Sequence, residues 1–288
     1  MIPSYPVFTE KDWNECSESG DFGYILFQWY GWIGNLATVV AFIQPNSGDF
    51  AAISKQEYHL WSALMVRCSR LMLSIKALTH EREFGETASI IHRSLMETAV
   101  KLIWVSAKDT VNRTQRLIAN GLQPELEFER LIQSNIQNNG GNSTPLEERM
   151  LVSTENHFLA AGLTKNEVEQ AKRIPNLASM FEDIGWSRLE YVIFQRLGSH
   201  AVHGNWPALI TDYLDETDLE GFDFMPRGTP VVMHPNLYMS GGRLVLAAIA
   251  AYSRVCLSPA AGTDFGGLAE EAYNRLMQDY EKAIKLGL

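Results

Sequence analysis

Cysteine is scarce in this chain of 288 residues, which has three, at positions 16, 68 and 256. They are isolated, odd in number and never part of a Cys-x-x-Cys pair, so the sequence predicts neither a disulfide framework nor a zinc knuckle. The N-terminus also lacks a basic start followed by an apolar run. We therefore expect no secretory signal and a cytoplasmic protein.

Basic residues are in the minority, with 24 Lys and Arg against 34 Asp and Glu and a formal net charge of -10. A broad cationic surface that binds nucleic acid nonspecifically is therefore not expected, which leaves room only for a local basic pocket. The chain also has no P-loop, dinucleotide-binding glycine motif, G-x-S-x-G or H-E-x-x-H. Those enzyme classes consequently lack support.

Charge is absent from residues 22–44, a stretch long enough to cross a bilayer. Gln28, Asn35, Thr38 and three glycines interrupt it, however, and no cluster of Lys or Arg flanks it. We therefore expect a buried or partner-covered helix here and no membrane span.

Alternating strand patterns are rare, with Thr229–His234 the one candidate, whereas helix signals recur. Capping boxes, in which a Ser or Thr and a Glu three residues later satisfy free N–H groups, predict helix starts at Ser54, Thr164 and Ser187. The sequence thus predicts an all-α, multi-helix bundle. Its expected divisions are an N-terminal apolar helix region at 1–53 and a helical core domain at 54–288, or one continuous domain over 1–288.

Proline and glycine predict where helices are joined. Pro124, Pro145 and Pro175 are each expected in a first helical turn or at a joint between helices. Residues 138–144 form the best candidate linker, and residues 221–236 the longest irregular stretch. The other expected helices span about 87–107, 237–257 and 267–285.

Polar residues interrupt the apolar pattern of the helix that begins at Ser187. Arg196, His200 and His203 stand at i, i+4 and i+7, within about 60° of arc on the apolar side of this helix. The sequence therefore predicts that they face the core. The residues that define the apolar side are Leu189, Val192 and Ile193.

A buried arginine costs several kcal/mol unless a partner meets it, so Arg196 calls for an acid, a phosphate or a second subunit. The structural alternative pairs Arg196 with a buried carboxylate and lets the two histidines bond to carbonyls. A glycine inside a helix, here Gly198, is explained by a close crossing of two helices, by a ligand that approaches the backbone or by fraying of the helix near Gly204. In a third interpretation His200 and His203 bind a metal, with Glu97 or His234 as further ligands.

A second polar stripe, Arg93, Glu97 and Lys101, runs through the apolar segment 89–105. Such i, i+4 spacing usually marks an exposed ladder worth about 0.2–0.5 kcal/mol per pair. Because apolar residues surround this stripe on both sides, we expect a central helix with a buried polar network. Glu97 is then a candidate partner for Arg196 or for one of the histidines.

The segment "HRSLMETAVKLIWV", followed about a hundred residues later by "YVIFQRLGSHAVHG", resembles a bacterial family of unknown function, number fifty-six seventy-seven among domains of unknown function. The likeness lies in the order of the helices and extends over roughly Trp61 to Leu257. Its specific positions are Arg93, Glu97, Ser199, His203 and Gly204.

Arg196 and His203, with six residues between them, also resemble the Arg-x(4–6)-His signature of the HEPN superfamily, although Leu197 replaces its usual polar residue. Many members of that superfamily are metal-independent ribonucleases of toxin–antitoxin and antiphage systems. The resemblance implies a homodimer with a composite site, no metal and no cofactor. In such a composite site His203 is expected to act as the general base, Arg196 to hold the phosphate and His200 to act as the general acid.

The implied supporting residues are Arg93, Glu97 and Ser199. RNA is the implied partner, although the net charge does not favour it. In the alternative, the chain is a non-enzymatic interaction module. Its Arg196, His200 and His203 face then receives an anionic small ligand or a partner helix.

Overall fold

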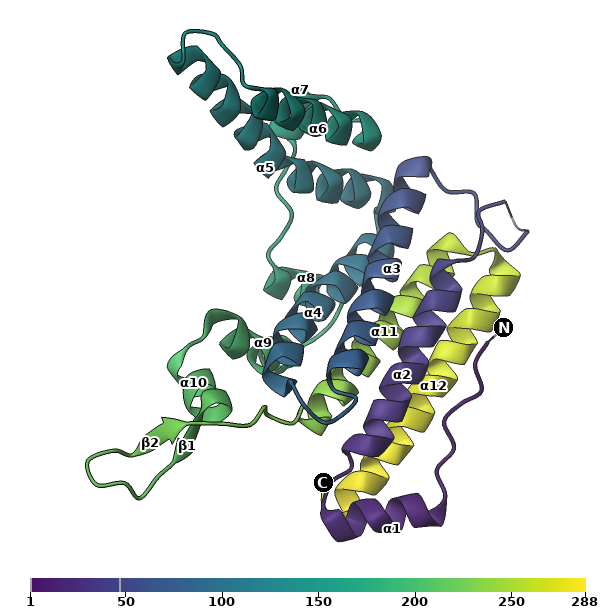
Figure 1. Cartoon of the computed structure of the whole chain (residues 1–288). Coiled ribbons are helices and arrows are strands. Elements are labelled where there is room, and N and C mark those ends of the chain that lie inside the picture. The colour runs from purple at the N-terminus through teal and green to yellow at the C-terminus, as the bar shows by residue number, and fades with distance from the viewer. Residues whose placement is uncertain (1, 47) are drawn as a thin grey trace.

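The computed structural model describes residues 2–46 and 48–288, apart from the side chains of residues 195–201. Over this part of the chain, helices dominate and the strands form one short hairpin, which confirms the all-α prediction (Figure 1). The elements are, in order, α1 Glu10–Ser19, α2 Gly23–Ala41, α3 Lys55–Leu78, α4 Gly85–Ala107, α5 Thr110–Asn138, α6 Pro145–Ala161, α7 Lys165–Gln170, α8 Leu177–Asp183, α9 Arg188–His203, α10 Trp206–Tyr213, β1 Leu214–Glu216, β2 Phe224–Pro226, α11 Pro235–Cys256 and α12 Pro259–Leu286.

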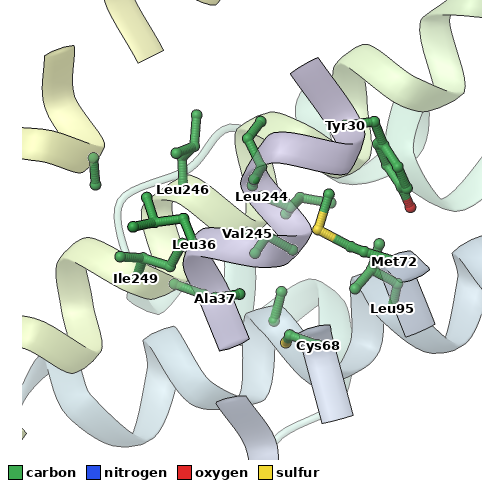
Figure 2. Close-up of a cluster of buried hydrophobic side chains, with 14 of the residues drawn as sticks. Tyr30, Leu36, Ala37, Cys68, Met72, Leu95, Leu244, Val245, Leu246 and Ile249 are labelled. Carbon is green, nitrogen blue, oxygen red and sulfur yellow. The ribbon is translucent and has the colours of Figure 1, made fainter. Parts of the chain in front are cut away.

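Four helices enclose the main core. Each of α2, α3, α4 and α11 packs against the next, and α11 returns to α2, while α12 covers α11 and α2 from outside. The helices α5, α6 and α7 project from one end of this bundle, and α10 with the β-hairpin projects from its α9 side (Figure 1). α9 packs along α4. Figure 2 shows how the four core helices meet through Tyr30, Leu36, Ala37, Cys68, Met72, Leu95, Leu244, Val245, Leu246 and Ile249.

The apolar stretch at residues 22–44 forms α2, which lies within the bundle. Trp29, Tyr30 and Ile33 are at most 1% exposed. The indole Nε1 of Trp29 donates to Asp279 at 2.7 Å, so its polar edge is satisfied while it ties α2 to α12. No helix of the described residues has the length and apolar character needed to cross a membrane.

The three capping boxes begin helices as predicted. Ser54, Thr164 and Ser187 each accept a hydrogen bond from the backbone of the Glu three residues later, which starts α3, α7 and α9. Pro145 opens α6 and Pro175 lies in the joint before α8, also as predicted. These boundaries follow from hydrogen bonds between near neighbours in the chain.

The prediction for Pro124 is wrong, because this proline lies inside the continuous helix α5. A proline within a helix removes one backbone hydrogen bond. On either side of it, Leu122 and Leu126 are buried against Phe158 of α6 and Val168 of α7. Packing against these neighbours holds α5 together across the proline.

The strand prediction for Thr229–His234 is also wrong. The strands are β1 and β2, which pair antiparallel with Asp215 opposite Met225. The backbone N–H of Val231 donates to the Glu86 carboxylate at 3.2 Å, and its carbonyl accepts from the Gly85 N–H at 2.7 Å. Because the start of α4 occupies these groups, they are not available to a second strand.

Candidate functional site

The helix α9 carries the stripe of Arg196, His200 and His203, and the aromatic residues Tyr191 and Phe194 attach it to the core. Phe194 is 4% exposed and stacks on Trp186, with ring centroids 6.1 Å apart. It also packs against Phe181 of α8. α9 therefore turns its Phe194 side toward the bundle.

The side that the sequence predicts to be buried faces solvent instead. Leu189 is 67% exposed, Val192 42% and Ile193 49%. His203 is exposed as well. The prediction that the stripe faces the core is therefore wrong for its described member, because the aromatic Phe194 rather than the aliphatic residues anchors α9.

Three of the predicted site residues, Arg196, Ser199 and His200, have side chains outside the described part of the chain, and the surroundings of Gly198 are outside it too. The backbone there is helical and continues to His203. Gly204 then ends α9 in the left-handed conformation, with φ of 53°, which glycine adopts without strain. His203 thus occupies the last residue of the helix, at its exposed end.

Large apolar side chains are exposed on α10 as well as on α9. We call this surface the α9–α10 face. It combines large apolar side chains that are at least 39% exposed, on α9 beside α4 and on the projecting α10 (Figure 1). Contiguous apolar patches on a monomer commonly mark interaction sites. Its members are Leu189, Val192, Ile193, Val202, Trp206, Leu209 and Tyr213.

The stripe on α4 is a half-exposed ion pair. The Arg93 Nε lies 3.0 Å from the Glu97 carboxylate, and the two side chains are 18% and 40% exposed. Arg93 is thus largely buried, whereas Glu97 is half-exposed, and the predicted contact of Glu97 with Arg196 falls on a side chain outside the described part of the chain. α4 is the expected central helix, with Leu95 and Val100 fully buried. The Nη1 of Arg93 is buried and has no hydrogen-bond partner among the described residues.

The two predicted stripes lie on neighbouring helices. Near the C-terminal end of α4, the Trp104 indole donates to Asp183, which ends α8 just before α9. At the opposite end of α4, Glu86 accepts from Val231, which follows the hairpin. The chain between these points packs α9 along α4.

A charged network that the sequence did not predict fixes the entry to α9. The Asp183 carboxylate accepts from the Trp104 indole at 2.8 Å, from Lys108 at 2.6 Å and from the buried guanidinium of Arg113. Arg113 also donates to the Trp104 carbonyl at 2.6 Å and stacks over the Trp104 ring. Hydrogen bonding to Lys108, then to Trp104, and the charge of Arg113 lower the pKa of Asp183.

No sequence signal links Arg113 to Asp183, because 70 positions separate them. The network attaches α8 to α4 and α5, and so supports α9. It is a structural element beside the candidate site.

Metal ligands do not gather in the described part of the chain, where no group of three His, Cys, Asp or Glu side chains is placed to hold an ion. His234 instead caps α11, since its Nδ1 accepts from the Asn236 N–H at 3.2 Å. The three cysteines are buried and free, at separate places in the fold.

Comparison with known proteins places the chain in a family. No curated protein and no solved structure matches it. The sequence model of the family of unknown function DUF5677 matches residues 58–222, more than half of the chain. The matched segment runs from α3 through α9 to the hairpin and includes both polar stripes. The chain therefore belongs to the family of unknown function DUF5677.

Proposed function

We propose that this protein is a metal-independent ribonuclease of the HEPN type, bacterial and cytoplasmic, whose site lies on α9 and is completed by a second copy of the chain. The observation that carries the proposal is the exposed position of His203 beside uncovered apolar side chains. A helix that presents a histidine next to an unburied apolar surface is suited to chemistry at an interface.

The proposed reaction is attack of the RNA 2′-hydroxyl on the adjacent phosphate. His203 takes the proton of the hydroxyl, because histidine is the side chain that most often acts as a general base. Arg196 binds the phosphate oxygens through paired N–H groups, and His200 protonates the leaving 5′-oxygen. Ser199, Arg93 and Glu97 support the site. The products are a 2′,3′-cyclic phosphate and a 5′-hydroxyl, and no metal or cofactor takes part.

The second copy is proposed to pack on the α9–α10 face. Ile193 and Trp206 are 49% and 61% exposed in the single chain, so burying them in a homodimer is favourable. Two copies of α9 related by a twofold axis would bring two sets of Arg196, His200 and His203 together. The excess of negative charge on the chain then opposes RNA binding less, because the basic groups of two copies converge at the site.

Cleavage of a mixed RNA in the presence of EDTA tests the chemistry. We expect His203→Ala to reduce the rate by about 10²- to 10⁴-fold, as for loss of a general base. His157→Ala is the matched control, since His157 is also exposed but lies on α6 next to Glu125. Circular dichroism checks that both variants fold. Equal rates for wild type and His203→Ala, or no cleavage by wild type over a range of RNAs, would refute the nuclease.

Sedimentation velocity tests the dimer. Ile193→Asp is expected to give a monomer, because it places a charge in the proposed interface. Leu159→Asp serves as the control, since Leu159 is 68% exposed on α6, away from α9. A wild-type monomer, or a dimer that Ile193→Asp leaves intact, would contradict the composite site.

The second candidate is a non-enzymatic interaction module on the same α9–α10 face. The net charge of -10 favours it, because it opposes RNA binding. In this case nucleotide or inorganic phosphate binds without turnover, and Arg196→Ala abolishes the binding. Cleavage that depends on His203 decides against this candidate.

A further inference from the structure

A hollow of about 390 Å³ lies behind α9, on its core side, between the start of α9 and the helices α11 and α12. This volume falls within the range of small-molecule sites. Small residues create the space: Ala247 and Ala250 on α11 face Gly266 and Ala269 on α12. The hollow is separate from the exposed stripe of α9.

Aromatic side chains form the walls of the hollow. Trp186 and Phe194 stack on the α9 side with an interplanar angle of 29°, and Tyr273 of α12 stands on the other. Flat walls of this kind accept a planar ring, because stacked and edge contacts between rings are favourable.

Arg243 of α11 supplies the positive charge of the hollow. Its Nε is buried and has no hydrogen-bond partner among the described residues. Its guanidinium lies over the Tyr273 ring, 5.9 Å from the centroid. A buried N–H group without an acceptor costs free energy.

Two acids stand near Arg243, and the positive charge of Arg243 helps to lower the pKa of Glu190, after the hydrogen bonds from Ser187. Glu190 also lines the hollow, but its Oε2 already accepts from the Ser187 N–H at 2.8 Å and hydroxyl at 2.9 Å, as the cap of α9. Glu270 is exposed at the rim. One available arginine beside these two carboxylates favours a ligand with a single negative charge over a dianion.

We propose that this hollow binds a small planar aromatic carboxylate, whose ring lies between Trp186 and Tyr273 and whose carboxylate accepts from Arg243. The site joins the start of α9, within the family segment, to helices α11 and α12 beyond it. It does not depend on the proposed ribonuclease activity.

Isothermal titration of the full chain with 2-naphthoate and with the neutral 2-naphthamide tests the site. We expect the acid to bind about tenfold more tightly, because a charge-assisted hydrogen bond is stronger than a neutral one. Arg243→Gln should remove this difference while the ring still binds.

Two adjacent glycines of α12 provide a matched pair. A Cβ at Gly266 or at Gly267 meets no atom within 4 Å, so both accept a side chain in the helix, but Gly266 lines the hollow and Gly267 does not. Gly266→Leu should abolish binding of 2-naphthoate, and Gly267→Leu should leave it unchanged. Thermal melts check that both variants fold.

Three results would overturn the proposal: no binding of 2-naphthoate by wild type, equal affinity for acid and amide, or unchanged binding in Gly266→Leu. The Gly266→Leu result decides the location of the site even where Arg243→Gln does not fold.

Discussion

Replacing Asp183 with alanine should destabilise the protein more than any change to its exposed neighbours. Arg113, with 6% of its side chain exposed, would keep one acceptor, the Trp104 carbonyl, and lose its counter-ion. Removing one partner of a buried ion pair costs about 3–5 kcal/mol. The Asp183 side chain is 30% exposed, so water can reach the guanidinium of Arg113 in the variant and replace part of the lost interaction. We therefore expect a loss at the lower end of this range, about 3 kcal/mol.

The contact with Lys108 contributes little of this free energy. Lys108 is 62% exposed, and exposed ion pairs are worth about 0–1 kcal/mol. Lys108→Ala should therefore lower the free energy of unfolding by less than about 1 kcal/mol, and the loss in Asp183→Ala should come from Arg113 and Trp104.

Thermal and urea unfolding measure these differences. A loss of about 3 kcal/mol corresponds to a fall in Tm of roughly 6–12 °C for a chain of this size. Glu182→Ala is the control, because Glu182 is the exposed neighbour of Asp183 on α8. If Asp183→Ala melts within about 2 °C of Lys108→Ala or of Glu182→Ala, the buried pair does not hold α8 as described.

Two further predictions concern the α4–α11 and α2–α11 contacts. Burial lowers the pKa of His92 from 6.5 to about 4, so the unfolded chain binds more protons than the folded one between these values. The free energy of unfolding should fall as the pH drops from about 6.5 toward 4, and His92→Phe should flatten that dependence in urea titrations; an unchanged slope would argue against it. A Cβ at Gly241 would lie 2.8 Å from the ring of the buried Tyr30. Gly241→Ala should therefore cost about 1–3 kcal/mol, whereas Gly228→Ala, where a Cβ meets nothing, should melt like wild type.

The wrong predictions share a cause in long-range packing. Periodicity found the amphipathic character of α9 but could not say which side the bundle would cover. Phe194 faces the core because Phe181 and Trp186 lie there, while Leu189 has no neighbour to bury it. A helical wheel measures the direction of apolar residues within one helix, and burial depends on what lies opposite.

The sequence by itself determined the helical class, the starts of α3, α7 and α9 at Ser54, Thr164 and Ser187, and the membership of both stripes in one family segment. Capping and helical periodicity involve residues three or four positions apart, so the local chain carries them. The tertiary structure decided that α9 exposes its aliphatic side, that Asp183 meets Arg113, and that α9, α11 and α12 leave a hollow around Arg243. Those features join distant segments, and packing of the whole bundle brings them together.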